Sequence, residues 1–205
     1  DGKKYEYIVF VFDKAGGLHY SETAYFQTAY ISGQIFADAD MISMNPEENI
    51  YENGQAIYYT TFDVQDKSLR KATFYGSALG MYDAYLNGNR IGSDELKPGW
   101  TDYNDTLLYH TYDITSYIRE NNTIASMVGT GWWCGRNGFG TYGYHQPAFI
   151  CQIVLEYEDG TMQTIRTDAD WNYTKNTAVR FADFFNGETY DFSKITAAQI
   201  SEGEK

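Results

Sequence analysis

The most constraining feature of the sequence is an alternation of apolar and polar residues that ends at a tight-turn signal. From Phe149 to Tyr157 every odd position is apolar, and the even positions are mostly polar, with Ile150 and Val154 as exceptions. A repeat of two residues is that of a β-strand with one fully buried face and one mixed face. The dipeptide Asp159-Gly160 follows, and it accepts the positive φ values of a short hairpin turn. We therefore expect an antiparallel partner strand to begin just after it.

The same pattern recurs along most of the chain. Turn signals such as Asn87-Gly88 and Asn121-Asn122 separate the apolar runs. Helical signals are sparse: one or two turns capped by Asp113 or Thr115, a single turn near Pro46, and a short helical or frayed end from Ile195 onward. Short strands with a turn signal about every 8–12 residues are typical of an antiparallel β-sandwich. The strand candidates are YEYIVFVF (5–12), AIYYTTFDV (56–64), LRKATFYGSA (69–78), MYDAYLNG (81–88), TIASMVGT (123–130) and MQTIRT (162–167).

The regularity of the pattern predicts three segments. Residues 1–56 are less regular and are expected to form an extension or linker that packs on the sandwich. Residues 57–195 carry the strand pattern and are expected to form the sandwich itself. Residues 196–205 are expected to begin a linker toward further domains.

The overall charge excludes several kinds of partner. The 205 residues have a formal net charge of -13, which disfavours nucleic acid and anionic membrane surfaces, because both are bound by clustered Lys and Arg. No apolar run reaches the roughly 18 residues of a membrane-spanning helix. Two cysteines, Cys134 and Cys151, permit at most one disulfide, and the strand pattern favours a buried free thiol at Cys151. The compartment stays open between the cytoplasm and a secreted or periplasmic location.

One segment stands out, the glycine-rich and aromatic run GTGWWCGRNGFGTYGYHQP from Gly129 to Pro147. Part of it fits the glycine spacing of a dinucleotide-binding turn, but that mechanism needs a helix afterwards, and here a strand follows. Zinc is disfavoured because Cys134 and His145 lack a second pair of ligands. Two interpretations remain. The aromatic rings either stack on the C–H faces of a sugar, or they fill the core while the glycines let the loop bend.

Candidate ligand residues follow from the sugar interpretation. Aromatic rings would stack on the sugar, and the polar side chains between them would bind its hydroxyl groups. The candidates are Trp132, Trp133, Arg136, Asn137, Tyr142 and His145.

Acidic side chains give two weaker hypotheses. Asp102 and Asn104 could supply oxygen ligands to calcium, although the spacing is not that of an EF-hand, and a polar turn is the competing interpretation. Paired carboxylates could hydrolyse a glycoside, but Asp102, Asp183, Glu188 and Asp191 are scattered, and acids in an acidic protein are usually surface residues.

Four motifs, in order, resemble the N-terminal accessory domain of bacterial α-L-rhamnosidases of glycoside hydrolase family 78. The first is ALGMYDAYLNGNRIG (78–92), the second LKPGWTDYNDTLLYHTYDIT (96–115), the third GTGWWCG (129–135) with QPAF (146–149), and the fourth DFFNGETYDF (183–192). In this family a small residue is more usual at the position of Cys134.

The resemblance implies an all-β fold, an antiparallel jelly-roll-like β-sandwich with few short helical turns. It implies that the complete protein hydrolyses terminal α-L-rhamnose from glycosides in a separate downstream (α/α)6 barrel, so that this chain alone is inactive. The expected partners are a rhamnose-containing glycan or glycoside and the downstream catalytic domain; no cofactor is required, with calcium as an open alternative. The domain either aids carbohydrate binding or substrate guidance, or is purely structural and packs on the barrel.

Overall fold

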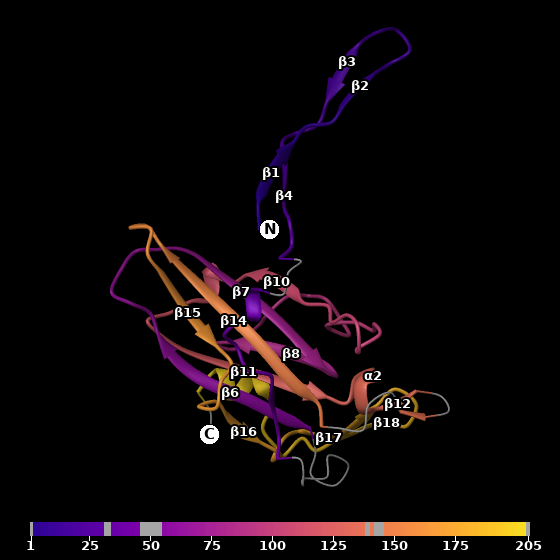
Figure 1. The fold of residues 1–205 in the computed structure, drawn as a ribbon, viewed down its shortest axis with the longest axis vertical. Helices are drawn as coiled ribbons and strands as arrows, with labels where there is room; N and C mark the ends of the chain where they lie inside the picture. Colours follow the sequence, from indigo (N-terminus) through magenta and orange to yellow (C-terminus); the bar gives the residue numbers. More distant parts are fainter. Residues whose placement is uncertain (1, 31–33, 46–54, 138–139, 142–145, 204–205) are drawn as a thin grey trace. The chain divides into compact units, whose positions relative to one another are not determined.

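A computed structural model describes residues 2–30, 34–45, 55–137, 140–141 and 146–203 (Figure 1). The chain divides into two compact units, Asp1–Ala37 and Asp38–Lys205. The turn expected around Pro46 lies outside the described residues. Within the described part, every helix is too short or too polar to cross a bilayer.

The first unit is a long antiparallel hairpin, the ribbon, and each of its two arms is divided into two short strands. The first arm holds β1 (Lys4–Tyr7) and β2 (Phe10–Phe12), and the second holds β3 (Leu18–Tyr20) and β4 (Ala24–Gln27). A 3-10 turn, η1 (Gln34–Phe36), follows them. β1 pairs with β4 and β2 with β3. The run 5–12, predicted as one strand, is thus divided between β1 and β2.

The second unit is a sandwich of two five-stranded antiparallel sheets. The first sheet has the order β10-β7-β14-β15, with β5 also paired to β14; the second has the order β16-β6-β11-β8-β9. The chain passes repeatedly from one sheet to the other, and the all-β sandwich predicted from the sequence is confirmed. The first sheet comprises β5 (Ile42–Ser43), β7 (Leu69–Leu79), β10 (His110–Asp113), β14 (Ala148–Tyr157) and β15 (Met162–Arg166). The second comprises β6 (Ala56–Asp63), β8 (Met81–Leu86), β9 (Asn89–Arg90), β11 (Asn121–Gly129) and β16 (Asn172–Thr174).

Smaller elements complete the unit. Two hairpins, β12 (Arg136–Asn137) with β13 (Gly140–Thr141) and β17 (Val179–Asp183) with β18 (Gly187–Tyr190), lie outside the main sheets. The helical elements are η2 (Thr115–Tyr117), α2 (Gly131–Cys134) and α3 (Ala197–Ser201).

The predicted turns have mixed outcomes. The hairpin at Asp159-Gly160 is confirmed, with φ of +83° at Gly160 and β15 directly after it. Asn121 and Asn122 were expected to form a turn but are the first residues of β11. The carboxamide of Asn122 instead accepts a hydrogen bond of 2.8 Å from the backbone N–H of Arg119. This bond closes the bend before the strand, so the turn lies earlier in the chain.

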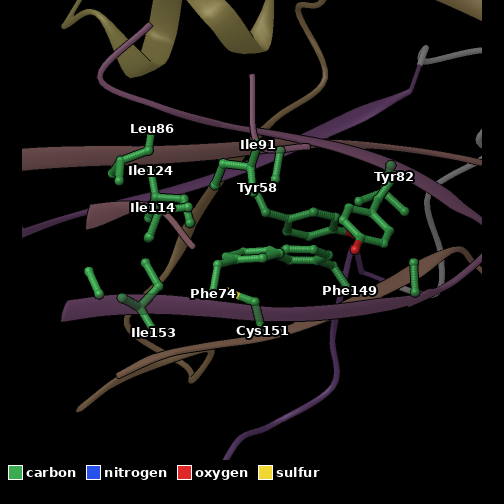
Figure 2. Close-up of a cluster of buried hydrophobic side chains, with 14 of the residues drawn as sticks. Tyr58, Phe74, Tyr82, Leu86, Ile91, Ile114, Ile124, Phe149, Cys151 and Ile153 are labelled. Atoms are coloured by element: carbon green, nitrogen blue, oxygen red, sulfur yellow. The ribbon is translucent and has the colours of Figure 1, made fainter. Parts of the chain in front are cut away.

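The core lies between the two sheets (Figure 2). Phe74 and Phe149 from the first sheet face Tyr58 and Ile124 from the second, and all four are buried. Each large apolar side chain removed from water contributes about 1.5–3 kcal/mol. Cys151 lies in the same cluster as a buried free thiol, as the strand pattern predicted.

The compact unit is longer than the segment 57–195 that the sequence pattern delimits. At its start, Ile42 of β5 pairs with Phe149 of β14. At its end, helix α3 packs on strand β11, with Ala197 and Ile200 buried against Ile57 and Ala125. The side chain of Thr196 accepts a hydrogen bond of 3.2 Å from the backbone N–H of Gln199, which starts the helix.

The turn between β8 and β9 fastens one end of the sandwich. Asn87 has φ of +51° and is buried, and its amide group donates to the carbonyl oxygen of Tyr117 (2.8 Å) and to Asn122 (2.9 Å). Its side-chain oxygen accepts from the backbone N–H of Thr123 at 3.0 Å. Asn87 therefore forms the turn and also connects it to Tyr117 of η2 and to the start of β11.

We predict that Asn87→Gly lowers the free energy of unfolding by about 2–3 kcal/mol, because it keeps the positive φ but leaves buried polar groups without partners. Asn87→Ala should cost about 1 kcal/mol more, because alanine resists the left-handed conformation. Urea denaturation followed by tryptophan fluorescence measures both values. Equal stabilities of the wild type and Asn87→Gly would contradict the prediction.

Candidate functional site

The aromatic segment begins with helix α2 at the end of strand β11. Gly131 has φ of +50°, and a Cβ atom there would lie 2.8 Å from the backbone carbon of Gly80 and 2.9 Å from the backbone nitrogen of Met81. Only glycine fits such a conformation so close to another backbone. This glycine turns the chain sharply and presents Trp132 and Trp133 from a helix, not from a strand.

Trp133 is a packing residue. It is partly buried against the sandwich core, and its indole N–H donates to the carbonyl oxygen of Gln146 at 3.3 Å. The ring of Tyr103 contacts it edge-on, with 5.6 Å between the ring centroids. This contact joins the two ends of the aromatic segment, since Gln146 lies two residues before the start of β14.

Trp132 lies in a stack of three aromatic rings. Its ring is nearly parallel to that of Trp100, at 6.1 Å, and lies 4.4 Å from the ring of Phe184. We name Trp100, Trp132 and Phe184 the aromatic ledge. Trp100 is 60% exposed and Phe184 39%, whereas Trp132 between them is half-buried.

Asp183 anchors one side of the ledge. Its carboxylate accepts hydrogen bonds from the backbone N–H groups of Arg136 (2.7 Å), Phe185 (2.9 Å) and Asn186 (2.9 Å). Burial acts to raise the pKa of Asp183, but these hydrogen bonds outweigh it and hold the pKa below its ordinary value. Thr130 adds a hydrogen bond of 2.9 Å to the carbonyl oxygen of Ala182. Helix α2 and the β17–β18 hairpin, which lie side by side in Figure 1, are thus held together by polar contacts.

Lys97 anchors the other side. Its ammonium group is fully buried, where it donates to the carbonyl oxygen of Ile91 at 2.8 Å and lies 3.4 Å from Asp83. It also lies 5.5 Å from the ring centroids of both Tyr82 and Tyr112. Since Lys97 is three residues from Trp100, this buried charge holds the start of the loop that carries Trp100.

Asp102 and Asn104 lie in the same loop and form a local turn. The side chain of Asp102 accepts from the backbone N–H of Asn104 at 3.1 Å, and its carbonyl oxygen accepts from Asp105 and Thr106. Among the described residues no group of three or more His, Cys, Asp or Glu side chains is placed to hold a metal ion. The polar-turn interpretation is therefore the one that this loop's contacts favour, and the calcium site stays a prediction.

The other predicted sugar ligands have different outcomes. Arg136 is exposed and begins strand β12, and its backbone N–H donates to the carboxylate of Asp183. Asn137 pairs with Gly140 across the β12–β13 hairpin. Tyr142 and His145 lie outside the described residues. The structure thus brings Trp132, Trp133 and the backbone of Arg136 into one region.

Two ring residues of the ledge, Trp100 and Phe184, were not among the predicted ligands. Both lie within motifs that the sequence does show, LKPGWTDYND and DFFNGETYDF. The sequence therefore offered one signal for each of them, an aromatic residue within a family motif. The sequence could not show that these two motifs meet at Trp132.

The chain matches known proteins over most of its length. Residues 67–201 match the family model described as the Alpha-L-rhamnosidase N-terminal domain. An α-L-rhamnosidase of Streptomyces avermitilis is 43% identical over 145 residues, and one of Alteromonas sp. is 33% identical over 153 residues. These alignments cover 69% and 73% of this chain but 14% and 16% of those proteins, so the chain spans only a small part of their length.

Solved structures agree with this match. The native α-L-rhamnosidase of Aspergillus terreus superposes with a TM-score of 0.83 at 26% identity, over 97% of this chain and 25% of that one. The Streptomyces avermitilis enzyme complexed with L-rhamnose gives 0.69 at 30% identity, over 97% and 21%. The fold, the four motifs and the family match agree: this chain belongs to the α-L-rhamnosidase N-terminal domain family.

Proposed function

We propose that this chain is a noncatalytic domain of an α-L-rhamnosidase, and that its aromatic ledge aids the binding or guidance of a rhamnose-containing glycan. The complete polypeptide would hydrolyse terminal α-L-rhamnose in a part outside these 205 residues. The single observation that carries the proposal is the stack of Trp100, Trp132 and Phe184, which is built from three of the family motifs and is partly open to solvent.

The chemistry of the ledge suits a sugar. A pyranose ring presents C–H groups on its faces, and such groups pack on exposed aromatic rings. Rhamnose adds a methyl group, which increases its apolar surface. Arg136 is exposed next to the anchor of the ledge and could donate hydrogen bonds to hydroxyl groups. Because both ends of the ledge are anchored, little side-chain order has to be imposed on binding.

Two of the candidate carboxylates, Asp183 and Asp191, are poorly suited to act as a general acid. A general acid for glycoside hydrolysis needs a raised pKa. The pKa of Asp191 is instead lowered by the hydroxyl and the backbone N–H of Ser193, and that of Asp183 is lowered by backbone N–H groups despite its partial burial. Both side chains close local turns.

The alternative is a structural domain whose exposed rings pack on the rest of the polypeptide. Phe185 and Phe192, in the same motif as Phe184, are 63% and 91% exposed, which favours some coverage of this surface. A sugar titration separates the two functions, because the structural alternative requires no affinity for rhamnose.

We predict that Trp100→Ala weakens binding of L-rhamnose at least about fivefold, since it removes about 1 kcal/mol of ring contact. The fold should survive, because this side chain is mostly exposed. Isothermal titration of the chain with millimolar L-rhamnose measures the affinity, and Phe192→Ala is the matched control that should leave it unchanged. The absence of any heat with the wild-type chain would reject sugar binding and favour the structural alternative.

The same titration tests calcium. If Asp102 and Asn104 hold an ion that assists binding, affinity for L-rhamnose falls when EGTA replaces calcium. Unchanged affinity in EGTA would contradict the calcium hypothesis and leave the ledge proposal intact.

We also predict that Asp183→Asn lowers the free energy of unfolding by about 1–2 kcal/mol at pH 7, because an amide N–H₂ would face the N–H of Arg136. The folded state favours the carboxylate, so this stabilisation is complete above about pH 5 and is lost as acid protonates the group below about pH 4. Urea denaturation at pH 7 and near pH 3 measures the difference. Asp191→Asn, which changes only a local turn, is the control and should lower the stability clearly less than Asp183→Asn does.

A further inference from the structure

The ribbon of residues 3–28 is a well-formed hairpin. At its tip, Asp13 accepts hydrogen bonds of 2.8 Å from the backbone N–H groups of Ala15 and Gly17, and it lies 3.0 Å from the ring nitrogen of His19. At its base, the backbone N–H of Thr28 donates to the carbonyl oxygen of Lys3 at 2.9 Å. Both ends of the hairpin are therefore closed by specific contacts.

The outer half of the ribbon has one strongly apolar face. Residues paired across two antiparallel strands point to the same side. Phe10 pairs with Tyr20 and Phe12 with Leu18, so these four side chains share a face, whereas Val11 and His19 share the other. Phe12 and Tyr20 are each 73% exposed.

The inner half repeats this arrangement. Tyr5 pairs with Phe26 and Tyr7 with Ala24, and the ring of Phe26 contacts both tyrosines, at 5.2 and 6.2 Å. The large side chains of this face are close to half exposed or more. Each half of this two-stranded ribbon thus carries an exposed aromatic face of its own.

Such a ribbon is incomplete as an independent unit. An isolated two-stranded hairpin is marginally stable in water, and a third strand or a packed surface is needed to make it stable. Its two edges also present unpaired backbone groups that can bind another strand. Exposed apolar patches of this kind mark interaction sites.

Charge argues against an electrostatic partner. Residues 2–30 contain three lysines and three acidic residues, although the whole chain has a net charge of -13. The ribbon is thus a nearly neutral, aromatic part of an acidic chain. Its partner is expected to be apolar, not a polyanion or a charged membrane surface.

Relatives show the kind of polypeptide in which such a ribbon occurs. The Aspergillus terreus match covers 97% of this chain, which leaves out about six of its 205 residues, far fewer than the ribbon contains. The Dictyoglumus thermophilum α-L-rhamnosidase covers 95%, with a TM-score of 0.74 at 27% identity. This chain spans only 25% and 23% of those single chains. A counterpart of the ribbon therefore occurs within polypeptides about four times longer.

We infer that the aromatic faces of the ribbon dock on an apolar surface of the same polypeptide, contributed by residues outside these 205. The ribbon then acts as an intramolecular clamp that joins this domain to the rest of the protein. The inference rests on the part of the proposed function that makes this chain one domain of a longer rhamnosidase, and it does not depend on sugar binding by the ledge.

Hydroxyl-radical footprinting of the complete polypeptide tests the inference without any mutation. Phe10, Phe12 and Tyr20 should be oxidised at least fivefold more slowly in the folded protein than in the same protein in urea, at every protein concentration. Oxidation as fast in the folded as in the unfolded protein would overturn the inference. Protection that disappears on dilution to monomers, checked by light scattering, would also overturn it by assigning the face to a second copy.

A pair of variants tests the energetic role of the face. In the complete polypeptide, Phe12→Ser should lower the melting temperature by several degrees, whereas Val11→Ser, on the opposite face of the same strand, should change it by less than about 1 °C. Equal effects of the two substitutions would contradict a face-specific dock. Titration of the 205-residue chain with L-rhamnose, in which the proposed catalytic part is absent, reports separately on the ledge, so failure of one proposal is distinguishable from failure of the other.

Discussion

The antiparallel pairing of β7 with β14 is the constraint on which the rest of the sandwich depends. The pairing is regular from Ala148 with Leu79 to Glu156 with Lys71, and the register shifts only at the last pair, Tyr157 with Leu69. If one of the two strands slipped by one residue, its core side chain, Phe74 on β7 or Phe149 on β14, would turn away from the core, because neighbouring strand residues point to opposite faces. The pairing also determines where β14 begins, and therefore where the aromatic segment after β11 has to end.

The ledge is a consequence of that frame. The segment leaves β11 at Gly129 and returns to β14 at Ala148, so its ends are fixed on opposite sheets. Gly131 turns it, Trp133 packs it on the core, and Asp183 ties it to the β17–β18 hairpin. Trp132 therefore lies at the surface, half-buried, where it stacks on the rings of Trp100 and Phe184 from two other loops. The exposed aromatic stack is thus a product of anchoring by polar and buried groups at its base.

The sequence was most informative where a local pattern has only one physical solution. The strand from 149 to 157, the Asp159-Gly160 turn and the all-β class all follow from the period-two pattern and positive-φ residues. The tryptophan pair shows the limit. In a strand, the two adjacent rings would point to opposite faces. Gly131 instead places them on a helical turn, and their packing partners decide that Trp133 lies against the core and Trp132 in the exposed stack. Likewise, Trp100 and Phe184 lie 32 and 52 residues from Trp132, and only the three-dimensional fold brings them together.

The two exposed aromatic surfaces differ in what holds them, and this difference argues for different occupants. In the ledge, each ring is supported by another ring, and the backbone beneath is fixed by a carboxylate and by a buried lysine. Such a surface keeps its shape without a partner, as a site for a small and weakly bound ligand requires. The ribbon has rings on a pair of strands with open edges, so its faces gain most of their stability by being covered. A sugar is too small and too polar to cover them, whereas an apolar protein surface can.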